Sequence, residues 1–239
     1  MQQTRAPSEI ALAIGCAPRT KPSPANAIVR YLKFWCAERT LFLCSTLAAV
    51  GLMLLSSVAY AGAQAEEQLS ASVQTALASA IADRSATRLV GDPAEVQAWL
   101  AEMSTRLASR MPDAEQRREF LTTVQYEASR AGLDPQLVLA VINHESAFRK
   151  YAISSASARG YMQVMPFWVK LIGTTEHNLF HLRTNLRYGC VILRHYLDIE
   201  KGDVVRALAR YNGSLGRFEY PNVVLGLMEN RWKWTPTKR

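Results

Sequence analysis

Apolar residues recur every three or four positions along most of the chain beyond residue 90, which is the spacing of one helix face. Asp92-Pro93-Ala94-Glu95 predicts a helix start, because it supplies an N-cap, a first-turn proline and an acid at the third position. No stretch alternates with period two for long, as a half-buried strand would. The pattern predicts an all-α protein with short connections and helices near 93–111, 113–132, 135–145, 184–198 and 203–212, with a last one from Pro221.

The longest apolar run, residues 41–61, carries no charge. Basic residues precede it, and Ala59-Tyr60-Ala61 matches the small-x-small pattern of a signal cleavage site. The run is also long enough to span a bilayer uncleaved. We therefore expect residues 1–61 to be an export signal peptide or an N-terminal inner-membrane anchor, which predicts a periplasmic location. Residues 62–90 are rich in Ala, Ser and Gln, and this composition predicts a weakly helical or disordered spacer.

Composition limits the class of protein. With 239 residues, 49% hydrophobic and 20% charged, the chain can bury one ordinary core and is not globally disordered. Three of its four cysteines precede residue 62, so it is not a disulfide scaffold. The net charge is +8, and residues 130–239 carry 16 basic against 8 acidic residues. This excess indicates either an anionic partner or a solvated basic surface.

One carboxylate stands out at the end of the apolar helix 135–145. Val138, Val141 and Ile142 precede Glu145 by seven, four and three positions, so Glu145 shares part of the core face. Burial beside Phe148 and the negative end of the helix both disfavour the ionised carboxylate, which predicts a raised pKa suited to a general acid. The alternative is a surface glutamate paired with a neighbouring cation.

Two further segments combine polar and apolar residues. Gln163 lies in the apolar run Gly160-Tyr161-Met162-Gln163-Val164-Met165-Pro166, where Gly160 permits close backbone approach. Tyr211-Asn212 closes the helix 203–212, ahead of Gly213. Each segment alone is equally consistent with ordinary packing or a helix C-cap.

Together these segments resemble the motifs of the family 1 lytic transglycosylases, which share the soluble-lytic-transglycosylase (SLT) domain. Glu145-Ser146-Ala147-Phe148 resembles the first motif, Gly160–Pro166 is similar to Gly-Leu-Met-Gln-x-x-Pro, and Asn185–Gly189 and Tyr211-Asn212 look like the next two. The departures include Tyr161 for Leu and Arg210 for Ala. The resemblance implies a lysozyme-like helical catalytic domain over residues 115–235, preceded by a helical extension over 91–114. It also implies that Glu145 is the sole catalytic acid/base and that the glycan contacts Ser154, Gly160, Tyr161, Met162, Gln163, Tyr211, Asn212 and Tyr220.

The implied reaction is the non-hydrolytic cleavage of the β-1,4 bond between N-acetylmuramic acid (MurNAc) and N-acetylglucosamine in peptidoglycan. The sugar's own N-acetyl and C6 hydroxyl groups would replace a second carboxylate and leave a 1,6-anhydro end. The resemblance implies no cofactor. A hydrolytic muramidase and a non-catalytic peptidoglycan-binding protein remain as alternatives.

Other chemistries fit the sequence less well. His144-Glu145 begins like a zinc protease motif, but position 148 is Phe instead of His. His177 and His181 could share a helix face but lack an evident third ligand, so we expect no metal site. We expect no nucleic-acid partner, because no aromatic-basic recognition motif occurs. The basic half should instead attract the anionic wall polymer, with Arg149, Arg159, Arg210 and Arg217 as candidates.

Overall fold

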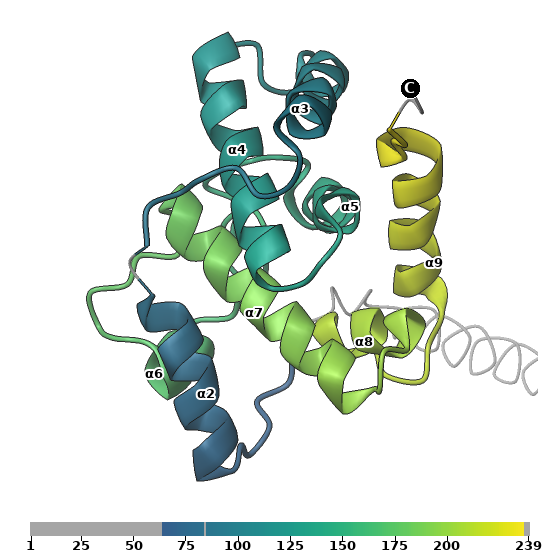
Figure 1. The fold of residues 1–239 in the computed structure, drawn as a ribbon. Coiled ribbons are helices and arrows are strands. Elements are labelled where there is room, and N and C mark those ends of the chain that lie inside the picture. Colours follow the sequence, from purple (N-terminus) through teal and green to yellow (C-terminus); the bar gives the residue numbers. More distant parts are fainter. Residues whose placement is uncertain (1–63, 84, 237–239) are drawn as a thin grey trace, which may run out of the picture. The chain divides into compact units, whose positions relative to one another are not determined.

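The computed structural model describes residues 64–83 and 85–236 of the chain. Helices dominate this part (Figure 1), and its only β-structure is two isolated bridges, so the predicted all-α class is confirmed. The α-helices are α2 (Ala71–Ala82), α3 (Pro93–Leu107), α4 (Ala114–Arg130), α5 (Pro135–Ser146), α6 (Phe167–Ile172), α7 (Leu182–Ile199), α8 (Val204–Tyr211) and α9 (Glu219–Leu227), and a short π-helix, Met228–Trp232, continues α9.

Aspartate caps account for four of the helix starts that the sequence predicted, those of α3, α4, α5 and α8. The side chain of Asp92 accepts the backbone N–H of Glu95 at 3.0 Å, and Asp134 accepts that of Gln136 at 2.7 Å. Asp203 caps α8 in the same way through Arg206, also at 3.0 Å. Each cap satisfies an amide that the first helical turn leaves without a partner.

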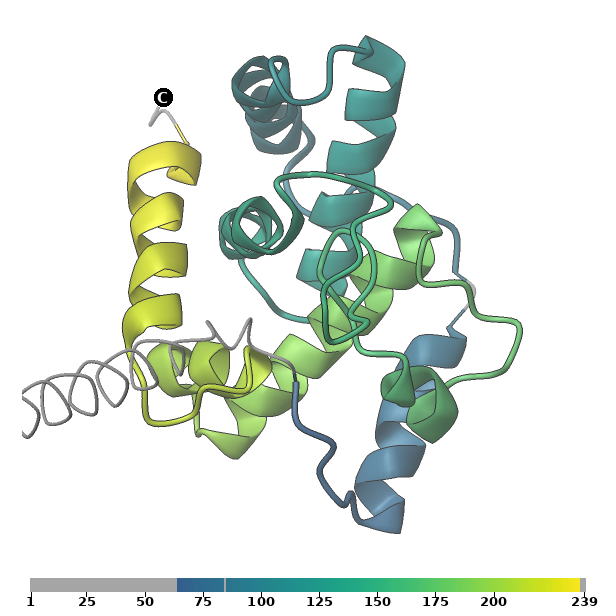
Figure 2. The same ribbon diagram turned by 180° about the vertical axis from the view of Figure 1, so that it is seen from behind.

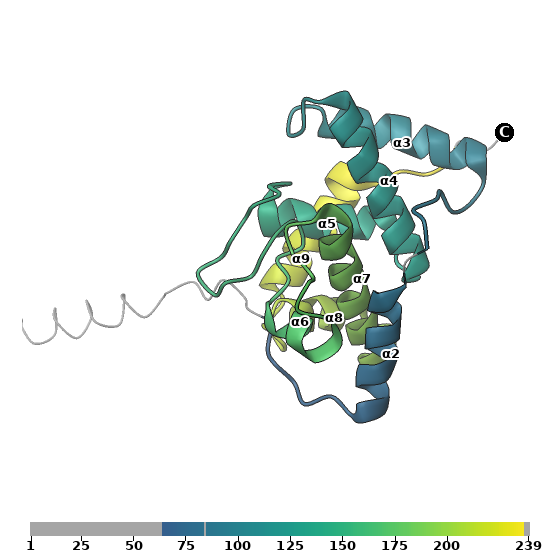
Figure 3. The same ribbon diagram turned by 90° about the vertical axis from the view of Figure 1, so that its left-hand side faces the viewer.

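The structure differs from the sequence prediction at three helices. α9 begins at Glu219, two residues before Pro221, because a proline in the first turn removes no helical hydrogen bond. α6 was not predicted, since six residues are too few to show a period. The expected spacer contains α2, whose Leu77 and Ile81 are buried in the core, and Gln74 Nε2 donates to Leu171 O at 2.6 Å. Figure 3 shows α2 against α6 and α7.

The hydrophobic core gathers around α4, α5 and α7, where α4 packs against both α5 and α7 and the outer helices cover them. Its largest fully buried side chains include Phe120, Trp168, Tyr188 and Trp232. α5 contacts both α9 and the π-helix, so the end of the chain closes over the helix that carries Glu145.

A buried ion cluster joins α4 to α7. The fully buried carboxylate of Glu127 accepts hydrogen bonds from Arg130 at 3.1 Å, Arg183 at 3.2 Å and Arg187 at 2.9 Å. Arg130 also pairs with Asp83, just beyond α2, at 3.3 Å. Removing one member of such a cluster leaves an uncompensated charge, which typically costs about 3–5 kcal/mol. The cluster therefore fixes the positions of α4, α7 and the end of α2 relative to one another.

The predicted signal or anchor segment, residues 1–61, lies outside the described residues. Over the part that the structure describes, none of the helices has the length and apolar character needed to cross a bilayer.

Candidate active site

Glu145 lies in the last turn of α5, where the chain turns sharply. Ala147 and Phe148 both adopt left-handed backbone conformations, with φ of 50° and 66°. This conformation is costly for residues other than glycine, so the surrounding packing must enforce it. The turn places the ring of Phe148 in the core, 5.9 Å from the ring of Phe120 and 5.4 Å from that of Trp232. The helix end that presents Glu145 is thereby fixed from two distant parts of the chain.

The carboxyl group of Glu145 is poised for proton transfer near neutral pH. Burial raises its pKa from 4.5 to about 7, and a hydrogen bond from Tyr220 partly offsets that rise. The Tyr220 hydroxyl donates to Glu145 Oε1 at 2.6 Å, and Tyr220 is itself buried at the start of α9. The ion pairs among the described residues do not include Glu145, and Arg149 Nε instead donates to Ser146 O at 3.0 Å. The alternative of a surface Glu in an ion pair is therefore wrong.

The loop between α5 and α6 lies over α4 and α7 (Figure 2), and a buried asparagine on α7 holds it there. Asn185 Oδ1 accepts the backbone N–H of Met162 at 2.8 Å, while its Nδ2 donates to Arg159 O at 2.8 Å and Leu179 O at 2.9 Å. Gly160 has φ of 75°, and a Cβ there would lie 2.5 Å from Asn185 Nδ2. Gly160 is therefore required for this close approach. Asn185 was noted as part of a motif but not predicted as a site residue.

Three predicted glycan-contacting side chains lie inside the core. Tyr161 packs against Phe120 with ring centroids 4.9 Å apart, and Met162 lies fully buried where a Cβ on Gly189 would collide with it. The Tyr211 hydroxyl donates to Met162 O at 2.7 Å, also within the core. These residues support the loop from behind, which corrects the expectation that their side chains face a ligand.

The remaining predicted residues differ in exposure: Gly160, Gln163 and Tyr220 are buried, whereas Ser154 and Asn212 are partly exposed. Gln163 adopts φ of 48°, and its Nε2 donates to Ala152 O at 3.1 Å and Gly160 O at 3.0 Å. Ser154 Oγ accepts the N–H of Ala158 at 3.1 Å, which stabilises a turn. Asn212 is partly exposed and donates to Ser214 Oγ at 3.0 Å. The structure thus brings Tyr220 to Glu145, whereas Ser154 and Gln163 shape the adjoining loop.

Arg210 does not provide the free positive charge that the sequence suggested. It pairs with Glu200 at 2.6 Å and with Glu67 at 2.7 Å, and only 19% of its side chain is exposed. Glu67 is 143 residues away along the chain, so sequence proximity could not reveal this pair. Arg149, Arg159 and Arg217 are exposed.

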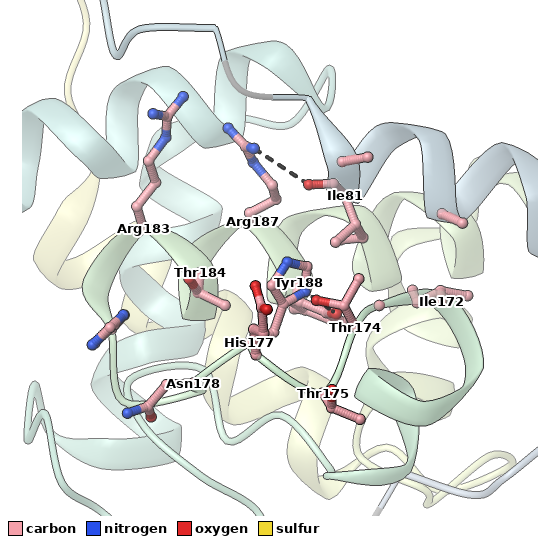
Figure 4. A pocket seen from close by; sticks show the side chains of 15 residues that line it. Ile81, Ile172, Thr174, Thr175, His177, Asn178, Arg183, Thr184, Arg187 and Tyr188 are labelled. Atoms are coloured by element: carbon pink, nitrogen blue, oxygen red, sulfur yellow. Dashed lines mark hydrogen bonds between the residues drawn. The ribbon is translucent and has the colours of Figure 1, made fainter.

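A separate pocket of about 670 Å³ lies between α2, α7 and the loop that joins α6 to α7 (Figure 4). His177 Nδ1 lies 2.8 Å from the Tyr188 hydroxyl in this pocket, beside Thr174 and the apolar Ile81. Glu145 does not line it. The pocket therefore does not form part of the site around the acid.

Comparison with known proteins supports the motif assignment. Residues 122–221 match the sequence model of the transglycosylase SLT domain. The chain is 36% identical over 95 residues to a "Transglycosylase" from Enterobacteria phage PRD1, covering 40% of this chain and 35% of the relative. It is 47% identical over 49 residues to "Membrane-bound lytic murein transglycosylase C" from Actinobacillus pleuropneumoniae serotype 5b (strain L20), covering 20% of this chain and 13% of the relative.

A solved structure was also found, that of an inactive mutant of the lytic transglycosylase Slt from Pseudomonas aeruginosa. The match has 21% sequence identity and a TM-score of 0.36, and covers 59% of this chain and 32% of that one. The chain spans about a third or less of the length of each of these proteins.

Proposed function

Because residues 122–221 match the sequence model of the transglycosylase SLT domain, we propose that this protein is a peptidoglycan lytic transglycosylase with Glu145 as its acid/base. The observation that carries the proposal is the carboxyl group of Glu145, whose pKa of about 7 keeps a substantial fraction protonated at neutral pH. Most glycoside hydrolases need a second carboxylate. Residues 146–175 contain none, and among the described groups only Tyr220 shifts the pKa of Glu145 besides burial.

The reaction proceeds in two steps that one carboxyl group can serve. Protonated Glu145 donates its proton to the glycosidic oxygen while the N-acetyl oxygen of MurNAc attacks C1, and the bond to the leaving sugar breaks. Ionised Glu145 then removes the proton from the C6 hydroxyl of the same sugar. That oxygen attacks C1, displaces the N-acetyl oxygen and closes the 1,6-anhydro ring. Intramolecular attack needs close alignment but consumes no water.

Tyr220 assists both steps by holding one carboxyl oxygen. Its hydroxyl donates to Glu145 Oε1, which leaves Oε2 for the substrate. The same hydrogen bond stabilises the carboxylate that forms after the first proton transfer, since a bond to a charged group is the stronger one. Tyr220 therefore acts as a positioning residue. The substrate lies against the loop between α5 and α6, which contains Ser154, Gly160 and Gln163, and against Asn212 at the end of α8.

The test is the identity of the products and their dependence on Glu145. Purified sacculi should yield muropeptides with anhydro ends, each one water lighter in mass than the reducing form. Glu145→Gln should fold normally and release at least 100-fold less. Reducing ends would support a hydrolytic muramidase instead, and absence of turnover by the wild-type protein would support a binding protein.

Peptidoglycan lies in the bacterial envelope, so the proposed function requires that the protein reach that compartment. We propose that residues 1–61 direct the chain there, as a cleaved signal or an inner-membrane anchor. N-terminal sequencing of the exported protein should begin near Gly62 or Gln64 if the signal is cleaved. A full-length product in the cytoplasm would contradict this proposal.

A further inference from the structure

Two aromatic side chains from separate loops meet at the surface: Tyr151, on the loop that follows α5, is exposed, and Phe180 is partly exposed. Tyr151, six residues after Glu145, is 70% exposed, and its ring centroid lies 5.8 Å from that of Phe180. Phe180 belongs to the loop between α6 and α7, so two separate segments form this surface. Nearby Ile153 is also 64% exposed. Adjoining exposed apolar side chains of this size commonly mark a binding surface.

Two cations accompany the rings. Lys150 Nζ lies 5.3 Å from the ring centroid of Tyr151, and the Arg159 guanidinium lies 6.0 Å from that of Phe180. The ion pairs among the described residues include neither cation, and the loop from Ala147 to Pro166 contains no Asp or Glu, whereas the loop of Phe180 contains one acid, Glu176. The surface formed by Lys150, Tyr151, Arg159 and Phe180, here called the Tyr151 surface, therefore combines apolar area with positive charge.

We propose that the Tyr151 surface, part of which belongs to the loop that follows Glu145, binds a peptide-bearing glycan strand. The apolar face of a sugar ring packs on Tyr151, and the carboxylates of the peptide stems pair with Lys150 and Arg159. A strand that carries both sugar rings and carboxylates matches the two chemistries of the surface. A second copy of this chain is a poorer occupant, because two surfaces of the same charge repel.

This inference rests on the proposed function, and binding is best measured without turnover. In a Glu145→Gln background, Tyr151→Ala should weaken binding to sacculi about tenfold, the equivalent of about 1.4 kcal/mol. Tyr151→Phe should restore it, since the ring is kept. Ile199→Ala is the matched control, because Ile199 is an exposed apolar residue at the far end of α7 and should bind like the parent.

The charges are tested with two ligands. Lys150→Gln combined with Arg159→Gln should weaken binding to peptide-bearing sacculi at low salt, with little effect on strands stripped of their peptides. High salt should remove the difference, because attraction between exposed charges is screened over about 8 Å at physiological ionic strength.

Three results would overturn the inference. They are equal binding by Tyr151→Ala and Ile199→Ala, equal charge effects on both ligands, and a self-association of the protein that Tyr151→Ala abolishes. Failure of the proposed function would look different. The protein with intact Glu145 would then form no anhydro ends, whereas the binding comparisons would still have an outcome.

Discussion

Replacing Tyr220 with Phe removes one hydrogen bond from the carboxyl group of Glu145, the proposed acid, and keeps the aromatic ring. The hydroxyl of Tyr220 donates to Glu145 Oε1 at 2.6 Å and lowers the pKa of Glu145, against the larger effect of burial. The ring of Tyr220 packs edge-on against His144 with centroids 5.0 Å apart, and Phe keeps that contact. The variant therefore tests the hydrogen bond separately from the packing.

The size of the effect follows from the strength of that bond. A hydrogen bond to a charged group is worth about 1.5–3 kcal/mol, and one pKa unit corresponds to about 1.4 kcal/mol. Tyr220→Phe should therefore raise the pKa of Glu145 by about 1–2 from its value of about 7. The carboxylate that forms during proton donation loses the same support, so the rate should fall by up to about 100-fold.

The assay is release of anhydro-muropeptides as a function of pH. The alkaline limb of the profile, where Glu145 loses its proton, should move to higher pH in Tyr220→Phe. Tyr196→Phe is the control, because the buried Tyr196 hydroxyl has no hydrogen-bond partner among the described residues. A lower rate with an unmoved alkaline limb, or a limb moved to lower pH, would refute the reasoning.

Three other predictions concern stability and binding. Glu145→Gln should stabilise the fold by up to about 3 kcal/mol at pH 8 and not at pH 4, because a carboxyl group whose pKa rises from 4.5 to about 7 on folding destabilises the folded state as pH rises through that range. If the urea midpoints of variant and wild type differed by the same amount at both pH values, this would be contradicted. Asn185→Ala should cost about 2–4 kcal/mol and lower activity, since it leaves three backbone groups, two of them buried, without their hydrogen-bond partner; an unchanged melting temperature would count against that role. Arg210→Ala should lower stability by about 1–3 kcal/mol and leave the salt dependence of sacculus binding unchanged, because the charge of Arg210 is already paired with Glu67 and Glu200 of the same chain. A weaker salt dependence in the variant would instead identify Arg210 as a binding residue.

Local signals in the sequence were sufficient for most helix starts and for the raised pKa of Glu145. Asp92, Asp134 and Asp203 cap their helices through amides two or three residues away, so the contact lies within the motif itself. The apolar face of α5 likewise predicted the raised pKa of Glu145, because burial is its main cause. Both inferences depend on fewer than ten neighbouring residues.

Contacts between distant segments could not be predicted in this way. Tyr220 and Glu145 are 75 residues apart, and Arg210 and Glu67 are 143 apart. The motif also could not show on which side a residue faces. Tyr211 lies in a segment that resembles a glycan-binding motif, yet its hydroxyl donates to Met162 O inside the core. A family motif identifies residues that the site needs, but only the packed structure shows whether a side chain faces the ligand or supports the loop from the core.

The arrangement around Glu145 depends on opposing effects that come from different parts of the chain. Burial by α5 and its neighbours raises the pKa so that the acid can hold its proton, and Tyr220 of α9 limits that rise so that the proton can leave. Trp232 of the π-helix packs on Phe148 and so supports the left-handed turn that ends α5. Because α9 and the π-helix are continuous, one segment near the end of the chain sets both the position and the acidity of the carboxyl group. A substitution that loosens this segment should therefore change the pH profile and the rate together, even where it lies far from the substrate.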